Sequence, residues 1–414
     1  MKHAAILGYG VVGSGVAEVV EMNSTKLELA IGEPIRIKKI LDIRDFPGDP
    51  FEGLLTKEAD EVFEDAEISI VAETIGGARI AYEFTKRALA KGKTVVTSNK
   101  ELVSTHGVEL MKLAKENGCS YLFEAAVGGG IPIIRPMHRC LTGNQITAIA
   151  GIVNGTTNYI LTQMANTGKG YQEALAEAQQ KGYAEQNPSA DIDGVDAKRK
   201  LAILSTIALD GAFVNSQKIH AEGIAGVSLN DIAYAKALDG KVKLLALFSR
   251  PEGQEKCRCV VAPHLLSNSS PLAVADDVFN AVMVTGNAVG DVMFYGQGAG
   301  KLATASAVVG DMVEAASQES DLPATLTWYV ANREVLADFA SSPVKALVRV
   351  GKSVTAEAVE KAFHGVSCEP VVANVIDGEK GYLVGLAQDL TEGVLADGLA
   401  GISDLKGWIR LCFG

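Results

Sequence analysis

Gly8-Tyr9-Gly10-Val11-Val12-Gly13 is the stretch that decides the fold of the first part of the chain. It follows a short apolar run over residues 3–7 and precedes an amphipathic pattern over residues 11–22. Between a strand and a helix, glycines at this spacing permit a tight turn, close approach of a pyrophosphate, and packing of the helix on the strand. The stretch therefore predicts a dinucleotide-binding turn, although an ordinary glycine-rich turn has the same spacing.

Around this turn, strand-like and helix-like patterns alternate. The expected strands are residues 3–7, 35–41, 68–73, 94–97 and 120–127, and the expected helices are residues 11–22, 79–91 and 101–117. Such alternation indicates βαβ units around a parallel sheet. We therefore expect an α/β protein whose residues 1–130 form a Rossmann-type, doubly wound domain.

Two further domains follow the break Gly128-Gly129-Gly130-Ile131-Pro132. A strand pattern at 145–153 and helical patterns at 171–181, 195–208 and 229–237 indicate a central α+β domain over 131–300. A small-residue helix after the glycines at 296–300 would return to the first domain at about 300–325. Residues 341–414 form the third domain. The patterns predict strand 344–350, helix 355–363, strands 370–376 and 381–388, a helix, and strand 408–412. This order of elements fits a βαββαβ unit.

Length and composition narrow the class of protein. The chain has 414 residues, 38 basic and 50 acidic, and a formal charge of −12. This charge disfavours nucleic acid and anionic lipid as partners. The apolar run at residues 1–7 is too short for a secretory signal, and the stretch 201–214 is too short and too polar for a membrane span. We expect a soluble, cytoplasmic protein.

Cysteine and histidine spacing gives no sign of a disulfide framework or a transition-metal site. The six cysteines contain no C-x-x-C pair, and the six histidines show no metal-ligand spacing. Reduced core thiols and no catalytic transition metal are therefore expected.

Asp42 and Arg44 follow the second strand and give conflicting signals about the nucleotide. A carboxylate here accepts from a ribose 2′-hydroxyl, which favours NAD, whereas an arginine pairs with the 2′-phosphate of NADP. The choice stays open.

Thr97-Ser98-Asn99-Lys100 closes a strand at the carboxyl edge of the predicted sheet. Ligands of open α/β sheets bind at this edge, which places Lys100 beside the nicotinamide end. The alternative is a solvated lysine that starts the next helix. Positive charge is unfavourable at a helix start, which favours the functional interpretation.

Acids and bases crowd the segment from Gly182 to Ala202, which contains Glu185, Asp191, Asp196 and Lys200. Asp196 and Lys200 are four residues apart and therefore share one helical face. From these residues alone, a capped and salt-bridged helix start is the favoured explanation of the pattern.

Five motifs, in this order along the chain, resemble homoserine dehydrogenases: Gly8–Gly13, Ser98–Lys100, the segment 124–132, Asn154-Gly155-Thr156-Thr157-Asn158-Tyr159-Ile160-Leu161, and the segment 191–204. Asp231-Ile232, Lys243–Ala246 and the Gly298-Ala299-Gly300 region extend the resemblance to about residue 320. It implies reversible NAD- or NADP-dependent interconversion of L-homoserine and L-aspartate 4-semialdehyde, within threonine, methionine and isoleucine biosynthesis.

The resemblance also implies roles for individual residues. Lys200 would act as the general acid/base, with Lys100 near nicotinamide and substrate, while Glu185 and Asp196 hold the amino-acid part of the substrate and Asp191 supports them. The cofactor would contact Gly8, Tyr9, Gly10, Val11, Val12, Gly13, Asp42, Arg44, Thr97, Ser98, Lys100 and Gly298. Asp42 stands where relatives often have a small apolar residue, which leaves the preference between NAD and NADP open.

Further implications concern a cation, regulation and assembly. Glu124 and the main-chain carbonyls of Val127, Gly129 and Ile131 would bind a structural monovalent cation, sodium or potassium, since oxygen ligands suit a hard ion. The C-terminal βαββαβ unit resembles an ACT domain, which implies regulation by an amino acid such as threonine. The resemblance also implies a homodimer or homotetramer, with a dimer formed through the central domain.

Other classes of protein fit less well. A phosphorylating aldehyde dehydrogenase needs a nucleophilic cysteine, and neither Cys119 nor Cys140 lies in a suitable motif. A catalytically silent amino-acid sensor would not need the full set of Lys100, Glu185, Asp196 and Lys200. Because the resemblance begins at the first residues, we expect the monofunctional form, without a fused aspartate kinase.

Overall fold

A computed structural model describes residues 1–251, 253–317, 327–371 and 375–412 of the chain. The chain divides into two compact units. The first contains residues 1–145, 202–216 and 294–332, and the second contains residues 146–201, 217–293 and 333–414. Among the described residues, no helix has both the length and the apolar character needed to cross a membrane.

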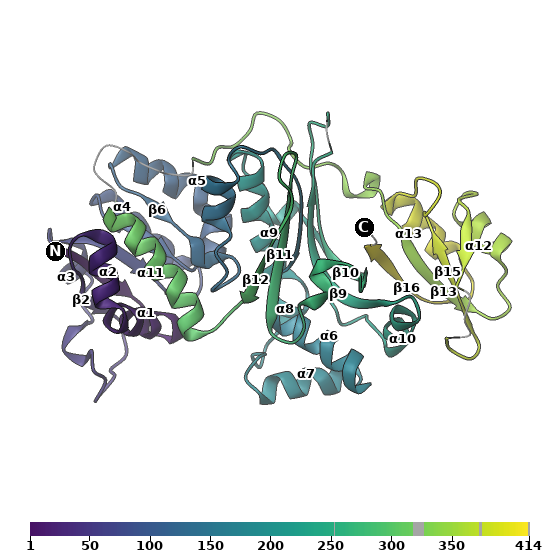
Figure 1. Cartoon of the computed structure of the whole chain (residues 1–414), viewed down its shortest axis with the longest axis horizontal. Helices are drawn as coiled ribbons and strands as arrows, with labels where there is room; N and C mark the ends of the chain where they lie inside the picture. Colours follow the sequence, from purple (N-terminus) through teal and green to yellow (C-terminus); the bar gives the residue numbers. More distant parts are fainter. Residues whose placement is uncertain (252, 318–326, 372–374, 413–414) are drawn as a thin grey trace. The chain divides into compact units, whose positions relative to one another are not determined.

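The first unit is built on a parallel sheet (Figure 1). Its strands are β1 (Lys2–Leu7), β2 (Ile35–Leu41), β3 (Leu55–Thr56), β4 (Ile68–Glu73), β5 (Thr94–Thr97) and β6 (Tyr121–Leu122). They lie in the order β3-β2-β1-β4-β5-β6, with every neighbouring pair parallel. The order reverses between β1 and β4, so a ligand crevice is expected beyond the carboxyl ends of these strands. The predicted doubly wound class is confirmed.

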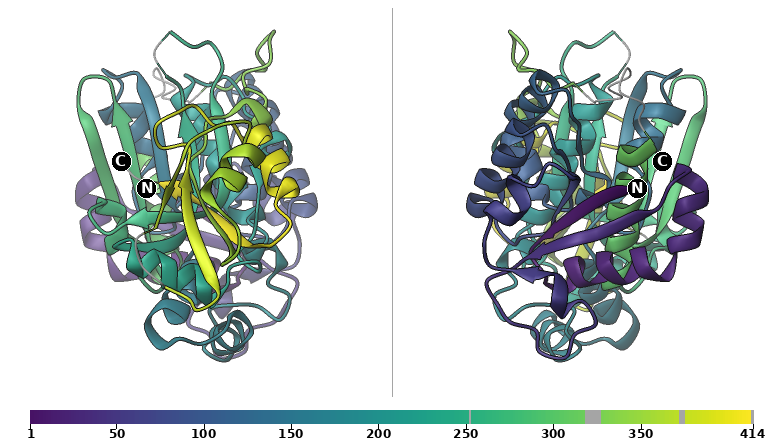
Figure 2. Two further views of the ribbon diagram at one scale, coloured as in Figure 1. Left: turned by 90° about the vertical axis from the view of Figure 1, so that its right-hand side faces the viewer. Right: turned by 90° about the vertical axis from the view of Figure 1, so that its left-hand side faces the viewer.

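Helices cover this sheet. They are α1 (Val11–Met22), α2 (Ser24–Ile31), α3 (Asp60–Phe63), α4 (Arg79–Ala90), α5 (Lys100–Glu116) and, much later in the chain, α11 (Lys301–Ser317). α11 packs beside α1, as Figure 1 and the right-hand view of Figure 2 show. A Cβ atom on Gly15 of α1 would lie 2.7 Å from the carbonyl oxygen of Lys301, so the close contact requires glycine. Of the expected return segment at 300–325, residues 318–325 lie outside the described residues.

The strand expected at 120–127 is mostly absent. Only Tyr121–Leu122 pair with β5, and Glu124–Ala126 form a short 3-10 turn, η2. The main-chain N–H of Glu124 donates to Asp311 Oδ2 of α11 (2.8 Å) instead of to a neighbouring strand. A side chain from a distant helix therefore ends the strand, and the local apolar pattern does not show this. Two short turns complete this unit, η1 (Glu52–Leu54) and η3 (Pro136–Cys140).

The second unit is built on a largely antiparallel sheet. Its first strands are β7 (Ile146–Ile152), β8 (His220–Ala221), β9 (Gly240–Ser249), β10 (Arg258–Ser267), β11 (Phe279–Gly286) and β12 (Gly290–Gln297). The helices and turns are α6 (Gly155–Thr167), α7 (Tyr171–Gln180), α8 (Ser189–Ile192), α9 (Val195–Ala208), η4 (Ser216–Lys218), α10 (Leu229–Ala237) and η5 (Pro271–Val274). The sheet runs β12-β11-β7-β9-β10. Two elements pass from this unit into the first, α9 after Leu201 and β12 after Met293.

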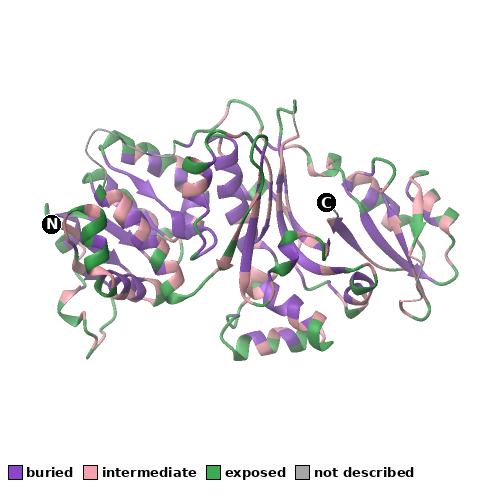
Figure 3. Cartoon of the chain, in the orientation of Figure 1, coloured by how far each residue is buried: buried purple, intermediate pink, exposed green. Residues whose placement is uncertain are grey.

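The end of the chain adds a βαββαβ module. It comprises β13 (Ala346–Gly351), α12 (Ala356–Ala362), β14 (Cys368–Pro370), β15 (Glu379–Val384), α13 (Glu392–Gly401) and β16 (Leu405–Cys412), preceded by η6 (Phe339–Ser341). Its strand order is β16-β13-β15-β14, and β16 pairs in parallel with β10, so the module extends the sheet of the second unit. β13 is buried along its whole length (Figure 3). Residues 372–374 of the strand expected at 370–376 lie outside the described residues.

Candidate active site

The glycine-rich turn between β1 and α1 has the geometry that a nucleotide phosphate needs. Gly8 has a φ of +88°, and a Cβ atom on Gly13 would lie 2.0 Å from the carbonyl oxygen of Gly8. Both positions therefore require glycine for the turn itself. A Cβ atom on Gly10 would meet only Arg44 Nη2, at 3.9 Å, so this position leaves the main chain accessible. The first turn of α1 carries no acidic side chain, which suits an anion at its N-terminus.

Asp42 and Arg44 lie beside this turn and bind each other. Asp42 Oδ1 accepts from the main-chain N–H (2.9 Å) and Nε–H (3.0 Å) of Arg44, while Oδ2 accepts from Arg44 Nη2 (2.8 Å) and from the N–H of Tyr9 (2.7 Å). The hydrogen bonds from Arg44 lower the pKa of Asp42 to about 2. The carboxylate is thus ionised and already holds four donors.

The turn after β5 is organised by a carboxyl group that the sequence analysis missed. Glu73 at the end of β4 is fully buried, and its carboxyl accepts from the Thr97 hydroxyl (2.6 Å) and the Ile75 N–H (2.7 Å). Burial raises the pKa of Glu73 to about 7. The Asn99 side chain accepts from the Leu102 N–H (3.0 Å) and so caps α5. In the sequence, an acidic residue at the end of an apolar strand pattern was the signal that could have identified Glu73.

Lys100 is the first residue of α5, next to Ser98 and Asn99. Its side chain is half-buried. The Nδ2 of Asn99 donates to the main-chain carbonyls of Ile75 (3.2 Å) and Gly77 (2.8 Å), which ties this turn to the end of β4. The structure therefore places Lys100 at the carboxyl edge of the parallel sheet, as predicted.

A buried cluster of charged groups forms in the second unit. Lys200 and Asp196 of α9 are 8% and 4% exposed, and Lys200 Nζ lies 2.7 Å from Asp196 Oδ2. Lys200 Nζ also donates to the main-chain carbonyl of Val153 (2.7 Å). The side-chain amide of Asn154 donates to Asp191 Oδ1 (2.7 Å) and to Asp196 Oδ2 (2.9 Å). Three residues predicted for the site are thus joined through Asn154, which the sequence analysis did not single out.

Glu185 is placed differently from the other predicted substrate ligands. It is exposed in the segment between α7 and α8, where its main-chain carbonyl accepts from Gln179 Nε2 (3.0 Å). The contacts that join Asp191, Asp196 and Lys200 do not include its side chain. A substrate-binding role for Glu185 stays a prediction.

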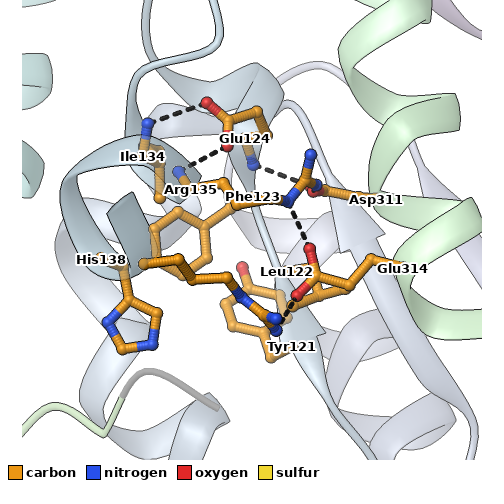
Figure 4. A pocket seen from close by; sticks show the side chains of 10 residues that line it. Tyr121, Leu122, Phe123, Glu124, Ile134, Arg135, His138, Asp311 and Glu314 are labelled. Atoms are coloured by element: carbon orange, nitrogen blue, oxygen red, sulfur yellow. Dashed lines mark hydrogen bonds and ion pairs between the residues drawn. The ribbon is translucent and has the colours of Figure 1, made fainter. Parts of the chain in front are cut away.

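Glu124 stabilises the main chain after the glycine break of the first unit. Its Oε1 accepts from the N–H groups of Ile133 (2.6 Å) and Ile134 (2.8 Å), and its Oε2 accepts from the N–H of Arg135 (2.7 Å). Figure 4 shows the bonds from Ile134 and Arg135. Burial raises the pKa of the neighbouring Asp311 to about 8. Arg135 pairs with Asp311, so this arginine partly offsets the desolvation of the carboxyl.

The same break brings Gly298 close to Gly129. Gly129 has a φ of +55°, and a Cβ atom on it would lie 2.5 Å from the Gly298 carbonyl oxygen. The N–H of Gly130 donates to the Gln297 carbonyl (3.1 Å). A pocket lies nearby in this unit, lined by Tyr121, Leu122, Phe123, Glu124, Ile134, Arg135, His138, Arg139, Asp311 and Glu314 (Figure 4).

Comparison with known proteins identifies the family. The family model described as "Homoserine dehydrogenase, NAD binding domain" matches residues 8–124, and the one described as "Homoserine dehydrogenase" matches residues 132–313. The homoserine dehydrogenase of Bacillus subtilis (strain 168) is 42% identical over 312 residues, covering 74% of this chain and 71% of that protein. The chain belongs to the homoserine dehydrogenase family. The resemblance seen in the motifs is confirmed.

Solved homoserine dehydrogenases share the fold. The enzyme from Thiobacillus denitrificans superposes with a TM-score of 0.89 at 33% identity, covering 99% of this chain and 98% of that chain. A hyperthermophilic archaeal homoserine dehydrogenase in complex with NADPH superposes with a TM-score of 0.64 at 31% identity, covering 76% of this chain and 98% of that chain. The family is one of NAD(P)-dependent oxidoreductases, so the prediction of a nicotinamide enzyme is confirmed.

The βαββαβ module lies beyond both family models, which end at residues 124 and 313. The archaeal homoserine dehydrogenase covers only 76% of this chain, so a member of the family can be about a quarter shorter. The dehydrogenase motifs therefore lie in the first two domains predicted from the sequence. Assignment of the module as an ACT domain stays a prediction.

Proposed function

We propose that this chain catalyses the reversible NAD(P)-dependent interconversion of L-homoserine and L-aspartate 4-semialdehyde, a step in threonine, methionine and isoleucine biosynthesis. Membership of the homoserine dehydrogenase family supports the reaction. The observation that carries the assignment of the site is the buried Lys200, held between Asp196 Oδ2 (2.7 Å) and the Val153 carbonyl (2.7 Å).

Lys200 is the proposed general acid/base. Bound NAD(P)H supplies the hydride for reduction of the aldehyde carbon. Lys200 donates a proton to the C4 oxygen as negative charge develops there, and it accepts that proton when homoserine is oxidised. The contacts with Asp196 and with the Val153 carbonyl fix the position of Nζ, so the proton is transferred at a defined point in the site.

Acidic side chains supply the selectivity for an amino acid. Carboxylates bind the substrate ammonium through charge-assisted hydrogen bonds. The clustering of Asp191 and Asp196 around Asn154 supports their role in this recognition. Glu185 is proposed on the family resemblance alone, and Lys100 is proposed to contact the nicotinamide and the substrate from the carboxyl edge of the parallel sheet.

NADP is the proposed preferred nucleotide. The Asp42 carboxylate already accepts four hydrogen bonds, so a ribose 2′-hydroxyl would have to displace one of its donors. The Arg44 side chain is 57% exposed and lies close to Gly10 of the phosphate-binding turn. It neutralises Asp42 and offers a guanidinium for the 2′-phosphate. The remaining predicted cofactor contacts are Tyr9, Val11, Val12, Thr97, Ser98 and Gly298.

A structural monovalent cation at the glycine break is also proposed. The candidate ligands are Glu124 and the main-chain carbonyls of Val127, Gly129 and Ile131, as the family resemblance implies. The described residues contain no cluster of three His, Cys, Asp or Glu side chains able to hold a metal ion, so a cation here depends on main-chain oxygens with Glu124. This donor set fits sodium or potassium.

We also propose regulation through the C-terminal module, and its attachment to the second unit supports this proposal. Arg410 of β16 binds Glu222 through two hydrogen bonds of 2.7 Å and binds Glu392 of α13 through Nε (2.7 Å). Two residues after Glu222, the N–H of Ile224 donates to the Ile192 carbonyl (2.9 Å), next to Asp191. We propose that an ACT-like module senses an amino acid such as threonine and acts on the site along this route.

The homodimer or homotetramer and the cytoplasmic location stay predictions.

Cysteine chemistry is not favoured as an alternative. Burial raises the pKa of Cys119 to about 11, so little of the nucleophilic thiolate is present at neutral pH. Cys140 is exposed at the end of η3, and the charged cluster around Lys200 lies in the other unit. A thioester mechanism therefore has no support at the candidate site.

Turnover of a Lys200→Ala variant tests the proposal. Reduced nicotinamide is followed by absorbance during homoserine oxidation at alkaline pH, with NAD or NADP, with and without threonine, and with sodium or potassium present. We expect loss of about 1,000-fold or more in kcat for Lys200→Ala, because general acid/base catalysis contributes up to about 10,000-fold. Binding of the nucleotide, measured by fluorescence titration, should be unchanged.

Lys198→Ala is the matched control, since Lys198 lies on the same helix and is half-buried. It should keep the activity of the wild-type protein. Normal turnover of Lys200→Ala would disprove the assignment of the acid/base. Inactivity of the folded wild-type protein with both nucleotides would disprove the reaction.

A further inference from the structure

We propose that Asn154 is a positioning residue that orients the carboxylates of Asp191 and Asp196 and, through Asp196, holds Lys200 in place. The inference rests on the proposed role of Lys200. Asn154 lies between β7 and α6 and is 6% exposed. It is the N-cap of α6, and this gives its side chain two separate tasks.

The first task fixes the orientation of the amide. Asn154 Oδ1 accepts from the main-chain N–H (2.9 Å) and the hydroxyl (3.0 Å) of Thr157. An amide nitrogen carries no lone pair for these donors, so the oxygen must face α6 and the NH₂ group must face the other way. The helix cap thus points both amide hydrogens toward the two aspartates.

The second task is the bridge between carboxylates. The Asn154 NH₂ group donates to Asp191 Oδ1 (2.7 Å) and to Asp196 Oδ2 (2.9 Å). Asp191 belongs to α8 and Asp196 to α9, so one neutral group connects the short helix and the helix that carries Lys200. Ionised carboxylates only accept hydrogen bonds, and a shared donor relieves the repulsion between them.

The bridge reaches Lys200 through a single oxygen. Asp196 Oδ2 accepts from Asn154 and also lies 2.7 Å from Lys200 Nζ. Nζ also donates to the carbonyl of Val153, the residue before Asn154. Both described contacts of the ammonium therefore depend on the two residues that join β7 to α6.

Loss of the bridge changes the charge balance at Lys200. A donor on Asp196 Oδ2 withdraws negative charge that otherwise stabilises the ammonium. The charged groups around Lys200 include Asp196 on its own helix and, across Asn154, Asp191 on α8. Without the donor, the protonated lysine is favoured. Homoserine oxidation needs the neutral amine, so the acidic limb of its pH profile should move to higher pH.

Asn154→Ser separates the two tasks of the residue. Serine is as good an N-cap as asparagine, so α6 keeps its first hydrogen bond. Its hydroxyl has only one hydrogen and cannot bridge two carboxylates. We expect a loss of about tenfold or more in kcat, since one lost hydrogen bond at a charged group is worth at least that factor. The KM for homoserine should rise, and the KM for the nucleotide should not change.

Asn154→Asp is the second variant. Aspartate also caps the helix, but it replaces the donor by a third carboxylate. The acidic limb of kcat should move upward by about one pH unit or more, further than in Asn154→Ser. If Asn154→Ser fails to fold, this limb of Asn154→Asp decides the question.

Asn158→Ser is the matched control. Asn158 lies one turn further along α6, is 1% exposed, and donates to the carbonyls of Ala275 and Phe279 (3.0 Å each). We expect it to lower the melting temperature while leaving the acidic limb of kcat where it is in the wild-type protein. It thus reports the cost of removing a buried asparagine from this helix.

The outcomes are distinguishable from those of the proposed function. If Lys200→Ala loses turnover while Asn154→Ser keeps the wild-type kcat and pH profile, the positioning role is wrong and the acid/base assignment stands. A loss of kcat in Asn154→Ser with an unmoved limb and a destabilisation equal to that of Asn158→Ser also overturns the role. If Lys200→Ala retains turnover, both proposals fail together.

Discussion

Replacing Glu73 by glutamine should remove a pH dependence of stability from the first unit. Glu73 is fully buried at the end of β4, and burial raises its pKa from 4.5 to about 7. The folded state therefore holds this proton more tightly than the unfolded state does. The free energy of unfolding consequently falls as pH rises from about 4.5 through 7.

The magnitude follows from the two pKa values. For one group with pKa values of 4.5 unfolded and about 7 folded, stability falls by about 2.5 kcal/mol between pH 5 and pH 8. Glutamine does not titrate, so Glu73→Gln should lack this contribution. Other groups with shifted pKa values, such as Asp311, are common to both proteins and cancel in the comparison.

Tryptophan fluorescence provides the assay. The chain has two tryptophans, of which Trp328 belongs to the first unit and Trp408 to the second. In a Trp408→Phe background, urea unfolding followed by Trp328 reports the first unit. The difference in unfolding free energy between Glu73→Gln and its parent should change by about 2.5 kcal/mol from pH 5 to pH 8. Glu83→Gln, an exposed change on α4, should show no such difference.

Parallel pH dependences for Glu73→Gln and its parent would refute the argument that burial sets the pKa of this carboxyl. If stability fell more steeply with pH in Glu73→Gln than in its parent, the pKa of Glu73 would be lowered by folding and not raised.

The remaining predictions concern three other parts of the chain. Arg44→Ala should raise the KM for NADP by about tenfold or more and leave the KM for NAD nearly unchanged, because the unpaired Asp42 carboxylate then repels the 2′-phosphate. Equal changes for both nucleotides would contradict this role of Arg44. Arg349→Leu should destabilise the second unit by about 3 kcal/mol, because Arg349 is buried and lies 2.9 Å from the buried Asp231. The fluorescence of Trp408 measures this, and a change below about 1 kcal/mol would show that the ion pair is not needed for stability. Replacing sodium and potassium by tetramethylammonium should lower the melting temperature of the wild-type protein but not of Glu124→Gln; an equal response of both proteins would argue against the cation site.

The sequence alone predicted the turns, helices and strands that are determined by interactions between neighbouring residues. The glycine turn needs Gly8 and Gly13 for steric reasons that any strand-turn-helix junction shares. The bounds predicted for β4, β5, α9 and α10 agree with the structure, because burial of one face imposes a periodic pattern on each. The family resemblance supplied the candidate residues of the site, since motifs keep their order along the chain.

The tertiary structure decided everything that depends on groups far apart in sequence. The strand expected at 120–127 stops at Leu122, and the N–H of Glu124 donates to Asp311 of a distant helix. Glu73 has a raised pKa because the packed domain removes water from it. Asn154 bridges two acids that lie 37 and 42 positions later in the chain. Desolvation and long-range hydrogen bonding arise only when the chain packs, and a local pattern contains neither.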